Sequence, residues 1–129
     1  RSTFQYSAGL AGAKLFYDRV LPQNSYSELT ITVSGVGYQT NSDVMALYCS
    51  VSNASGCGYS EVSNTGANAW LQTITKTWCL DATPGAEQRI LLYLMPTGLT
   101  NTVYLRDISV IVDGSTTADG CGGSGFQVP

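Results

Sequence analysis

Aromatic side chains are the residues of this chain whose chemistry is easiest to interpret. There are eight Tyr, two Trp and three Phe, while only 12% of the residues are charged. Sugars have flat C–H faces, which stack on Trp or Tyr. Their fringe of hydroxyls forms hydrogen bonds with amide and charged side chains. The residues expected to form such a platform are Tyr38, Tyr48, Tyr59, Trp78 and Gln72.

The five candidates differ in whether the sequence predicts them in loops or in strands. Tyr38 and Tyr59 fall in predicted loops, while Trp78 shares a strand face with Trp70 and Gln72. The competing interpretation is that Trp and Tyr in a small β protein belong mostly to the core. The pattern predicts Tyr38, Tyr59 and Trp78 as the exposed rings that would bind a neutral oligo- or polysaccharide.

Catalytic machinery is hard to find in the sequence. There is no His, which removes His-based triads, and a GxSxG elbow, a P-loop and a GxGxxG after a strand are all missing. The Gly-rich run Gly120-Cys-Gly-Gly-Ser-Gly125 opens no predicted helix. Paired carboxylates remain as an option for glycoside hydrolysis, but no spacing singles out a pair, and the acids are expected to be solvated. We therefore predict a domain that is not an enzyme. The acids considered are Asp18, Glu28, Asp43, Glu61, Asp81, Glu87, Asp107, Asp113 and Asp119.

The four cysteines predict disulfides rather than a metal site. Cys49, Cys57, Cys79 and Cys121 allow three pairings, and no CxxC pair or His is present to bind zinc. The expected bridges are Cys49–Cys57 and Cys79–Cys121. Disulfides in a small Ser/Thr-rich chain predict a secreted or extracellular-surface location, and Asn53-Ala54-Ser55 would be a glycosylation site in a eukaryotic source.

Charge and hydropathy exclude other partners. The net charge is −3, and the six Lys and Arg residues are scattered, so neither a nucleic-acid track nor a polybasic membrane patch is predicted. The longest apolar run, Ile90 to Met95, is too short for membrane insertion. The apolar fraction of 43% is enough for a core.

The elements that must position these residues read as β-strands. Strands are expected at 14–21, 26–33, 43–51, 59–62, 69–80, 88–95 and 103–112, separated by turn-forming residues. The strand at 103–112 places Ile108, Val110 and Val112 on one face and looks covered on both sides, as a central strand would be. The fold class predicted is all-β: a two-sheet antiparallel β-sandwich (jelly roll) with disulfides. Residues 1–112 would form this domain, and 113–129 a Gly/Ser-rich tail, tied back by Cys121.

Three segments together resemble the galactose-binding-like jelly rolls, a fold shared by many carbohydrate-binding modules. They are the run from Ala13 to Gly35, the segment Trp70-Leu-Gln-Thr, and Val103 to Val110, whose order and spacing agree over residues 13–112, most of the chain. The resemblance implies the fold and a carbohydrate-binding role. Family members often hold a structural calcium; here Arg106 replaces the first acid of the closing strand, so only Asp107 could contribute to it, and no cofactor is predicted.

Two functions follow as hypotheses. The first is a non-catalytic carbohydrate-binding domain of a secreted or cell-surface protein. The alternative is a structural or adhesive jelly-roll module that mediates self-association or contact with another protein through a sheet face or edge.

Overall fold

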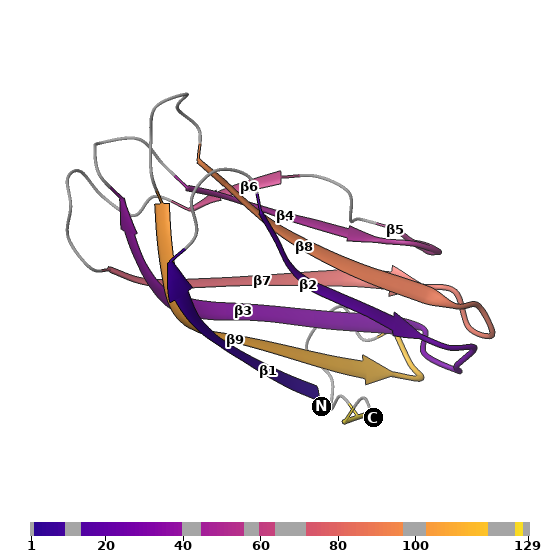
Figure 1. Cartoon of the computed structure of the whole chain (residues 1–129). Coiled ribbons are helices and arrows are strands. Elements are labelled where there is room, and N and C mark those ends of the chain that lie inside the picture. Colours follow the sequence, from indigo (N-terminus) through magenta and orange to yellow (C-terminus); the bar gives the residue numbers. More distant parts are fainter. Residues whose placement is uncertain are drawn as a thin grey trace.

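The chain folds as two antiparallel β-sheets packed face to face (Figure 1). The structure is a computed structural model, and it describes residues 2–9, 14–39, 45–55, 60–63, 72–96, 103–118 and 126–127. All elements among these residues are strands, which confirms the all-β sandwich that the alternating sequence predicted. The strands are β1 (Ser2–Gly9), β2 (Lys14–Leu21), β3 (Glu28–Gln39), β4 (Met45–Val51), β5 (Ala54–Ser55), β6 (Ser60–Ser63), β7 (Gln72–Ala82), β8 (Gln88–Pro96), β9 (Val103–Ser115) and β10 (Phe126–Gln127).

The larger sheet has the order β1-β9-β3-β7-β5, and β10 pairs with β9. Strand β9 lies between β1 and β3, so the predicted central position of this strand is confirmed. Its side chains alternate as expected: Ile108, Val110 and Val112 are fully buried. Asp107, at a β-bulge, interrupts the regular ladder and has a φ of 55°, which Asp tolerates better than most residues.

The smaller sheet has the order β2-β8-β4-β6. Strand β8 is central in it, pairing with β2 on one side and with β4 on the other. The strand is apolar where it faces the core: Ile90, Leu92 and Leu94 are fully buried. The alternate residues of β8 therefore point away from the core, toward the outer face of this sheet.

The core lies between the two sheets and is filled by their inward-facing side chains. Leu29, Ile31 and Val33 of β3 lie across from the buried residues of β8 and from Leu47 of β4 within one hydrophobic cluster. Each side chain of this kind contributes about 1.5–3 kcal/mol on burial, so this cluster accounts for the stability of the sandwich. Glu28, expected on a wet face, is instead only 4% exposed, at the start of the central strand β3.

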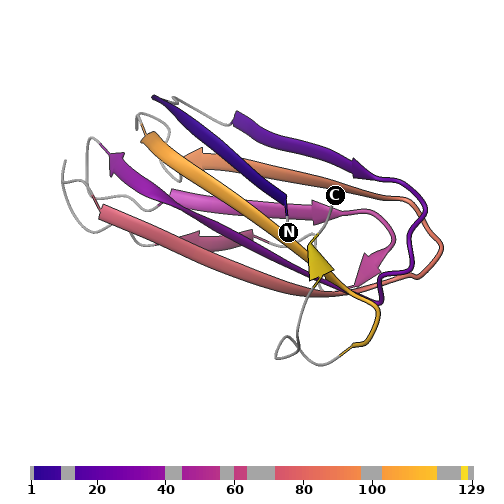
Figure 2. The same ribbon diagram turned by 90° about the horizontal axis from the view of Figure 1, so that it is seen from below.

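The two ends of the chain differ from the expected pattern. Residues 2–9, which none of the expected strands includes, form β1 along one edge of β9, from Tyr104 to Val112. Strand β9 continues to Ser115, three residues past its expected end, and β10 pairs with it at Asp113 and Gly114 (Figure 2). Backbone pairing explains both, because a ladder needs hydrogen-bonding partners and no hydrophobic period. The division into a domain and a tail remains a prediction.

Candidate functional site

The outer face of the smaller sheet carries the candidate site, which we call the tyrosine face. It consists of the solvent-facing side chains of three adjacent strands. Alternation places them there, because residues between them along the strands, such as Tyr17, Leu92 and Cys49, are buried in the core. The members are Leu15, Asp18 and Val20 of β2, Arg89, Leu91 and Tyr93 of β8, and Tyr48 and Ser50 of β4.

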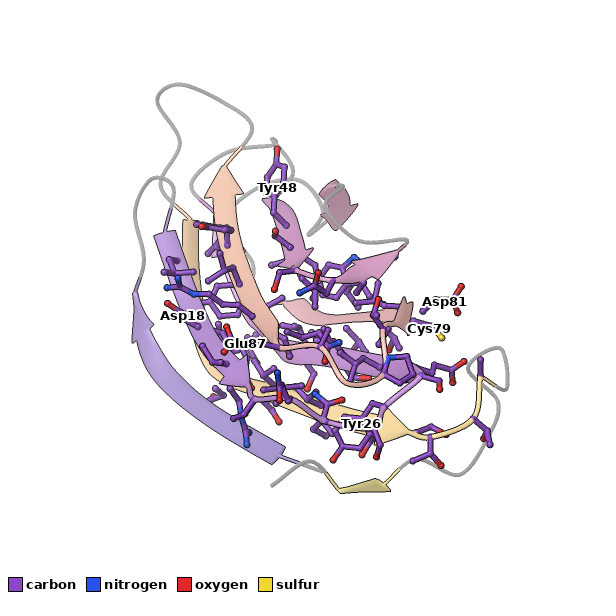
Figure 3. All side chains as sticks on the ribbon, turned by 90° about the vertical axis from the view of Figure 1, so that its right-hand side faces the viewer. Asp18, Tyr26, Tyr48, Cys79, Asp81 and Glu87 are labelled. Atoms are coloured by element: carbon purple, nitrogen blue, oxygen red, sulfur yellow. The ribbon has the colours of Figure 1, made fainter. Side chains whose placement is uncertain are left out.

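Strand register brings the two tyrosines together. Tyr93 lies directly opposite Tyr48 on one side and opposite Leu15 on the other, so the three form one row across the sheet. Side chains in such positions have Cβ atoms about 4.5–5.5 Å apart. Two phenol rings and an isobutyl group thus form a continuous apolar strip. Figure 3 shows Tyr48 projecting away from the sheet, with its hydroxyl outermost.

The next row is mixed and lies one repeat along the strands. It contains Asp18, Leu91 and Ser50, in register across β2, β8 and β4. Rows on the same face of a sheet are about 6–7 Å apart. A polar edge therefore borders the apolar strip, the combination that a sugar with an apolar face and a hydroxyl fringe requires.

An ion pair joins two strands at this polar end. Arg89 donates two hydrogen bonds to Asp18, from Nε to Oδ1 at 3.0 Å and from one Nη to Oδ2 at 2.7 Å. The hydrogen bond from Arg89 lowers the pKa of Asp18, and that to Asp18 raises the pKa of Arg89. The nearby carboxylate of Glu87 raises the pKa of Arg89 further, to a smaller extent.

The exposure of this face is unusual for apolar side chains. Leu15 and Val20 are 47% and 44% exposed, the largest exposures of large hydrophobic residues in the described part of the chain. Both belong to β2, at the edge of the smaller sheet. Exposed apolar side chains that gather on one face indicate a surface that binds something.

Of the predicted platform residues, Tyr48 is the one that this face contains. Tyr59 lies outside the described residues. The backbones of Tyr38 and Gln72 lie in β3 and β7 of the other sheet, with Gly37 paired to Gln72, and their side chains are outside the described part. Their roles in binding therefore remain predictions.

The prediction that Trp78 is an exposed platform is wrong. Its side chain is 1% exposed and packs in the core, opposite Ile31 of β3. The alternation within β7 was assigned correctly, but the tryptophan side faces inward because Thr75 and Thr77 occupy the outer face. The Nζ of Lys76 lies 6.0 Å from the centroid of the Trp78 ring, at the outer limit of a cation–π contact.

Sequence reasoning missed Tyr93, Leu15 and the Arg89–Asp18 pair. The signal for Tyr93 was present, since Arg89, Leu91 and Tyr93 alternate with Gln88, Ile90, Leu92 and Leu94 in an apparently uniform apolar run. What the sequence did not contain was the register, which places this side of β8 between Leu15 and Tyr48.

Of the two predicted disulfides, the structure contradicts one and does not test the other. Cys49 is a buried thiol, so the predicted Cys49–Cys57 bridge is wrong; its side chain packs inward between Leu47 and Val51 and belongs to the core. Cys79 is disulfide-bonded, and both Cys57 and Cys121 lie outside the described residues. The pairing of Cys79 with Cys121 therefore remains a prediction.

Neither the calcium nor the glycan attachment site gains support from the described residues. No three His, Cys, Asp or Glu side chains gather there into a group that could hold a metal ion. Asn53 has a φ of 56°, and its Nδ2 donates to the carbonyl of Glu87 at 2.8 Å. This amide holds a turn, a structural role that the sequon did not reveal; glycosylation at Asn53 remains a prediction.

Among the described residues, no helix has both the length and the apolar character to cross a bilayer.

Comparison with known proteins gives weak structural likenesses alone. No protein-family model and no curated protein matches the sequence. Similar solved structures include the carbohydrate-binding module CBM36 in complex with calcium and xylotriose (13% identity, TM-score 0.46, covering 89% of this chain and all of that one). Others are TmCBM61 in complex with β-1,4-galactotriose (12%, 0.42, covering 84% and 68%) and dimeric latent PorU from Porphyromonas gingivalis (13%, 0.42, covering 84% and 12%). At these TM-scores the likenesses add nothing to what the strand pairing establishes.

Proposed function

We propose that this chain is a non-catalytic carbohydrate-binding domain that holds a neutral glycan on the tyrosine face. The observation that carries the proposal is the register that sets Tyr48, Tyr93 and Leu15 side by side on a solvent-facing surface. Rings arranged across strands stack on the C–H faces of sugar units, and this stacking does not require a cleft.

The polar groups around the strip support a sugar over a purely apolar ligand. Ser50 and the Asp18–Arg89 pair lie beside Leu91, within one to two rows of the tyrosines. Hydroxyl and guanidinium groups at this distance can bond the fringe of a ring that stacks on Tyr93. The ligand class that fits is an uncharged oligo- or polysaccharide, and the setting that we propose for it is secreted or on the cell surface.

Binding to a panel of neutral polysaccharides tests this function. Affinity electrophoresis and isothermal titration of the whole chain should detect at least one glycan, with millimolar to micromolar affinity. Tyr93→Ala and Tyr48→Ala should each weaken that binding about tenfold, as expected for a loss of roughly 1–2 kcal/mol of stacking. Thr75→Ala, on the outer face of the other sheet, is the matched control and should bind as wild type does.

Tyr93→Phe separates the ring from its hydroxyl. If stacking dominates, this variant keeps most of the affinity that Tyr93→Ala loses. Absence of binding across the panel, or equal binding by both alanine variants and wild type, would refute the proposed site.

A second function has one observation in its favour. The exposed Leu15 and Val20 both lie on β2, at the edge of the sheet, where a second copy could pair with the strand or cover its apolar side chains. This self-association predicts a molar mass that rises with concentration in light scattering. Val20→Lys would abolish the rise, whereas Tyr48→Ala would leave it unchanged.

A further inference from the structure

The polar end of the tyrosine face contains a cation, Arg89, that is paired with a carboxylate. Arg89 uses Nε and one Nη to hold both carboxylate oxygens of Asp18, at 3.0 and 2.7 Å. Guanidinium has five N–H donors, so three remain to face solvent or a ligand. Both side chains are accessible, with 56% of Arg89 and 35% of Asp18 exposed, so the pair lies on the surface that a bound glycan would touch.

Backbone contacts also fix the pair in place. Val20 lies opposite Arg89, and Asp18 lies opposite Leu91, so the guanidinium reaches diagonally from β8 to β2. On the other side of β8, the backbone N–H of Arg89 donates to Ser52 Oγ at 2.8 Å, and Ser52 N–H donates to the carbonyl of Arg89 at 3.2 Å. The backbone of Arg89 is thus held between β2 and Ser52, two rows along β8 from Tyr93.

The pair removes net charge from this surface. The charges of Asp18 and Arg89 cancel, and Glu87, exposed just before β8, is the further charged group that acts on Arg89. At this pair an acidic sugar therefore meets a guanidinium whose charge is already compensated, and the carboxylate of Glu87 nearby. A neutral sugar can still form hydrogen bonds with Arg89, because the remaining guanidinium N–H groups donate to its hydroxyls.

We propose that the Asp18–Arg89 pair sets the specificity of the tyrosine face, admitting uncharged glycans and rejecting those that carry carboxylates. This inference rests on the proposed glycan-binding function. Asp18 is the specificity-determining residue: it does not contact the sugar in this scheme but cancels the charge of Arg89 and occupies its Nε–Nη fork, one of the sites where a uronate carboxylate would form a bidentate pair. Removing the Asp18 charge should convert Arg89 into a uronate-binding group.

The test compares two forms of one polysaccharide, which differ only in whether their carboxylates are charged. The probes are fully methyl-esterified homogalacturonan and its de-esterified form, beside the neutral glycan that binds best in the panel above. Asp18→Asn should raise the ratio of acidic to esterified binding about threefold to fivefold, the size of an exposed ion pair. The gain should disappear at high salt, because it is electrostatic.

Two matched variants complete the design. Asp18→Glu, which retains the carboxylate, should keep the wild-type ratio, and Arg89→Gln should show no gain for the acid. Thermal melting of each variant shows whether the fold is kept.

The outcomes separate the two proposals. If wild type binds a neutral glycan through Tyr48 and Tyr93 but Asp18→Asn leaves the ratio unchanged, the specificity inference fails and the proposed function stands. A wild-type chain that binds the acidic form as well as the esterified one also overturns the inference. If no variant binds any glycan, both proposals fall.

Discussion

The ring of Tyr26, which is labelled in Figure 3, lies directly against the backbone of Gly114. A Cβ built on Gly114 would stand 2.7 Å from Cδ1 and Cε1 of that ring, closer than real Cβ atoms approach. The turn that leads into β3 is thereby packed on the last residues of β9, with Asn24 Oδ1 accepting from the Tyr26 N–H at 2.9 Å. A residue without a side chain is required at position 114 for steric reasons.

Gly114→Ala is expected to destabilise the domain by about 1–3 kcal/mol, because the added methyl must displace a partly buried ring. Urea unfolding measures the loss. The double variant Gly114→Ala/Tyr26→Ala should lose less than the sum of the two single variants, since without the ring the methyl has room. Gly85→Ala is a useful contrast: nothing lies within 4 Å of its added Cβ, and its cost would come from a φ of 84° alone. Additive losses in the double variant would contradict the contact.

Gln88 should not tolerate a charge. Its side chain is fully buried, with Oε1 accepting from Asn24 at 2.8 Å and Nε2 donating to the carbonyl of Thr83 at 3.1 Å. Gln88→Glu replaces that donor with an oxygen facing a carbonyl, which costs about 2–4 kcal/mol at neutral pH. Burial would raise the pKa of the new carboxyl, so the loss should shrink as pH falls and the group is protonated.

A matched control for this substitution lies one position earlier. Glu87→Gln exchanges the same two side chains on an exposed residue and should change the free energy of unfolding little. If Gln88→Glu is as stable as wild type between pH 4 and pH 8, the amide is not the donor that the structure shows.

The Asp18–Arg89 pair should leave a weak signature in the acid range. Because Arg89 lowers the pKa of Asp18 below its ordinary value of 3.8, the pair stabilises the fold above that value. The contribution is lost as pH falls through the lowered pKa. The difference in melting temperature between wild type and Asp18→Asn should therefore be constant at neutral pH and vanish in strong acid. High salt should reduce it, and a difference that grows toward acid pH would have the wrong sign.

Cys49 should react only when the fold opens. It is 1% exposed within the core cluster, so iodoacetamide should leave it unlabelled in the native chain and label it in denaturant. Peptide mapping under non-reducing conditions supplies the measurement and also identifies the partner of Cys79. A peptide in which Cys49 is bridged, or rapid labelling of Cys49 without denaturant, would contradict the structure.

Much of the fold could be predicted from alternation along single strands. The bounds of β2 agree with the expected 14–21, and those of β4 and β8 to within two residues, because turn formers such as Pro22 and Asn24 interrupt the pattern. The buried side of β9 could be predicted for the same reason. Local alternation identifies the two faces of a strand but not which one points into the core. For this reason the sequence predicts Trp78 as exposed, whereas its side chain is buried.

The candidate site depends on information that single strands do not carry. Tyr48 was identified from its own strand, but its neighbours Tyr93 and Leu15 come from segments 45 and 33 residues away, respectively, along the sequence. Which strands pair, and in which register, is decided by the whole core, so no local pattern places these three side chains in one row. The same holds for the diagonal from Arg89 to Asp18.

Strands β1 and β10 lie end to end along one edge of β9. Ser2 pairs with Val112 and Gln127 with Asp113, so the first and last described strands occupy consecutive positions of a single ladder. The hydrogen bonding along this edge therefore does not depend on how β1 and β10 are connected along the chain. A circularly permuted chain, with Gln127 linked to Ser2 through a short peptide and new termini opened in the turn after Pro22, would preserve every strand pairing described above.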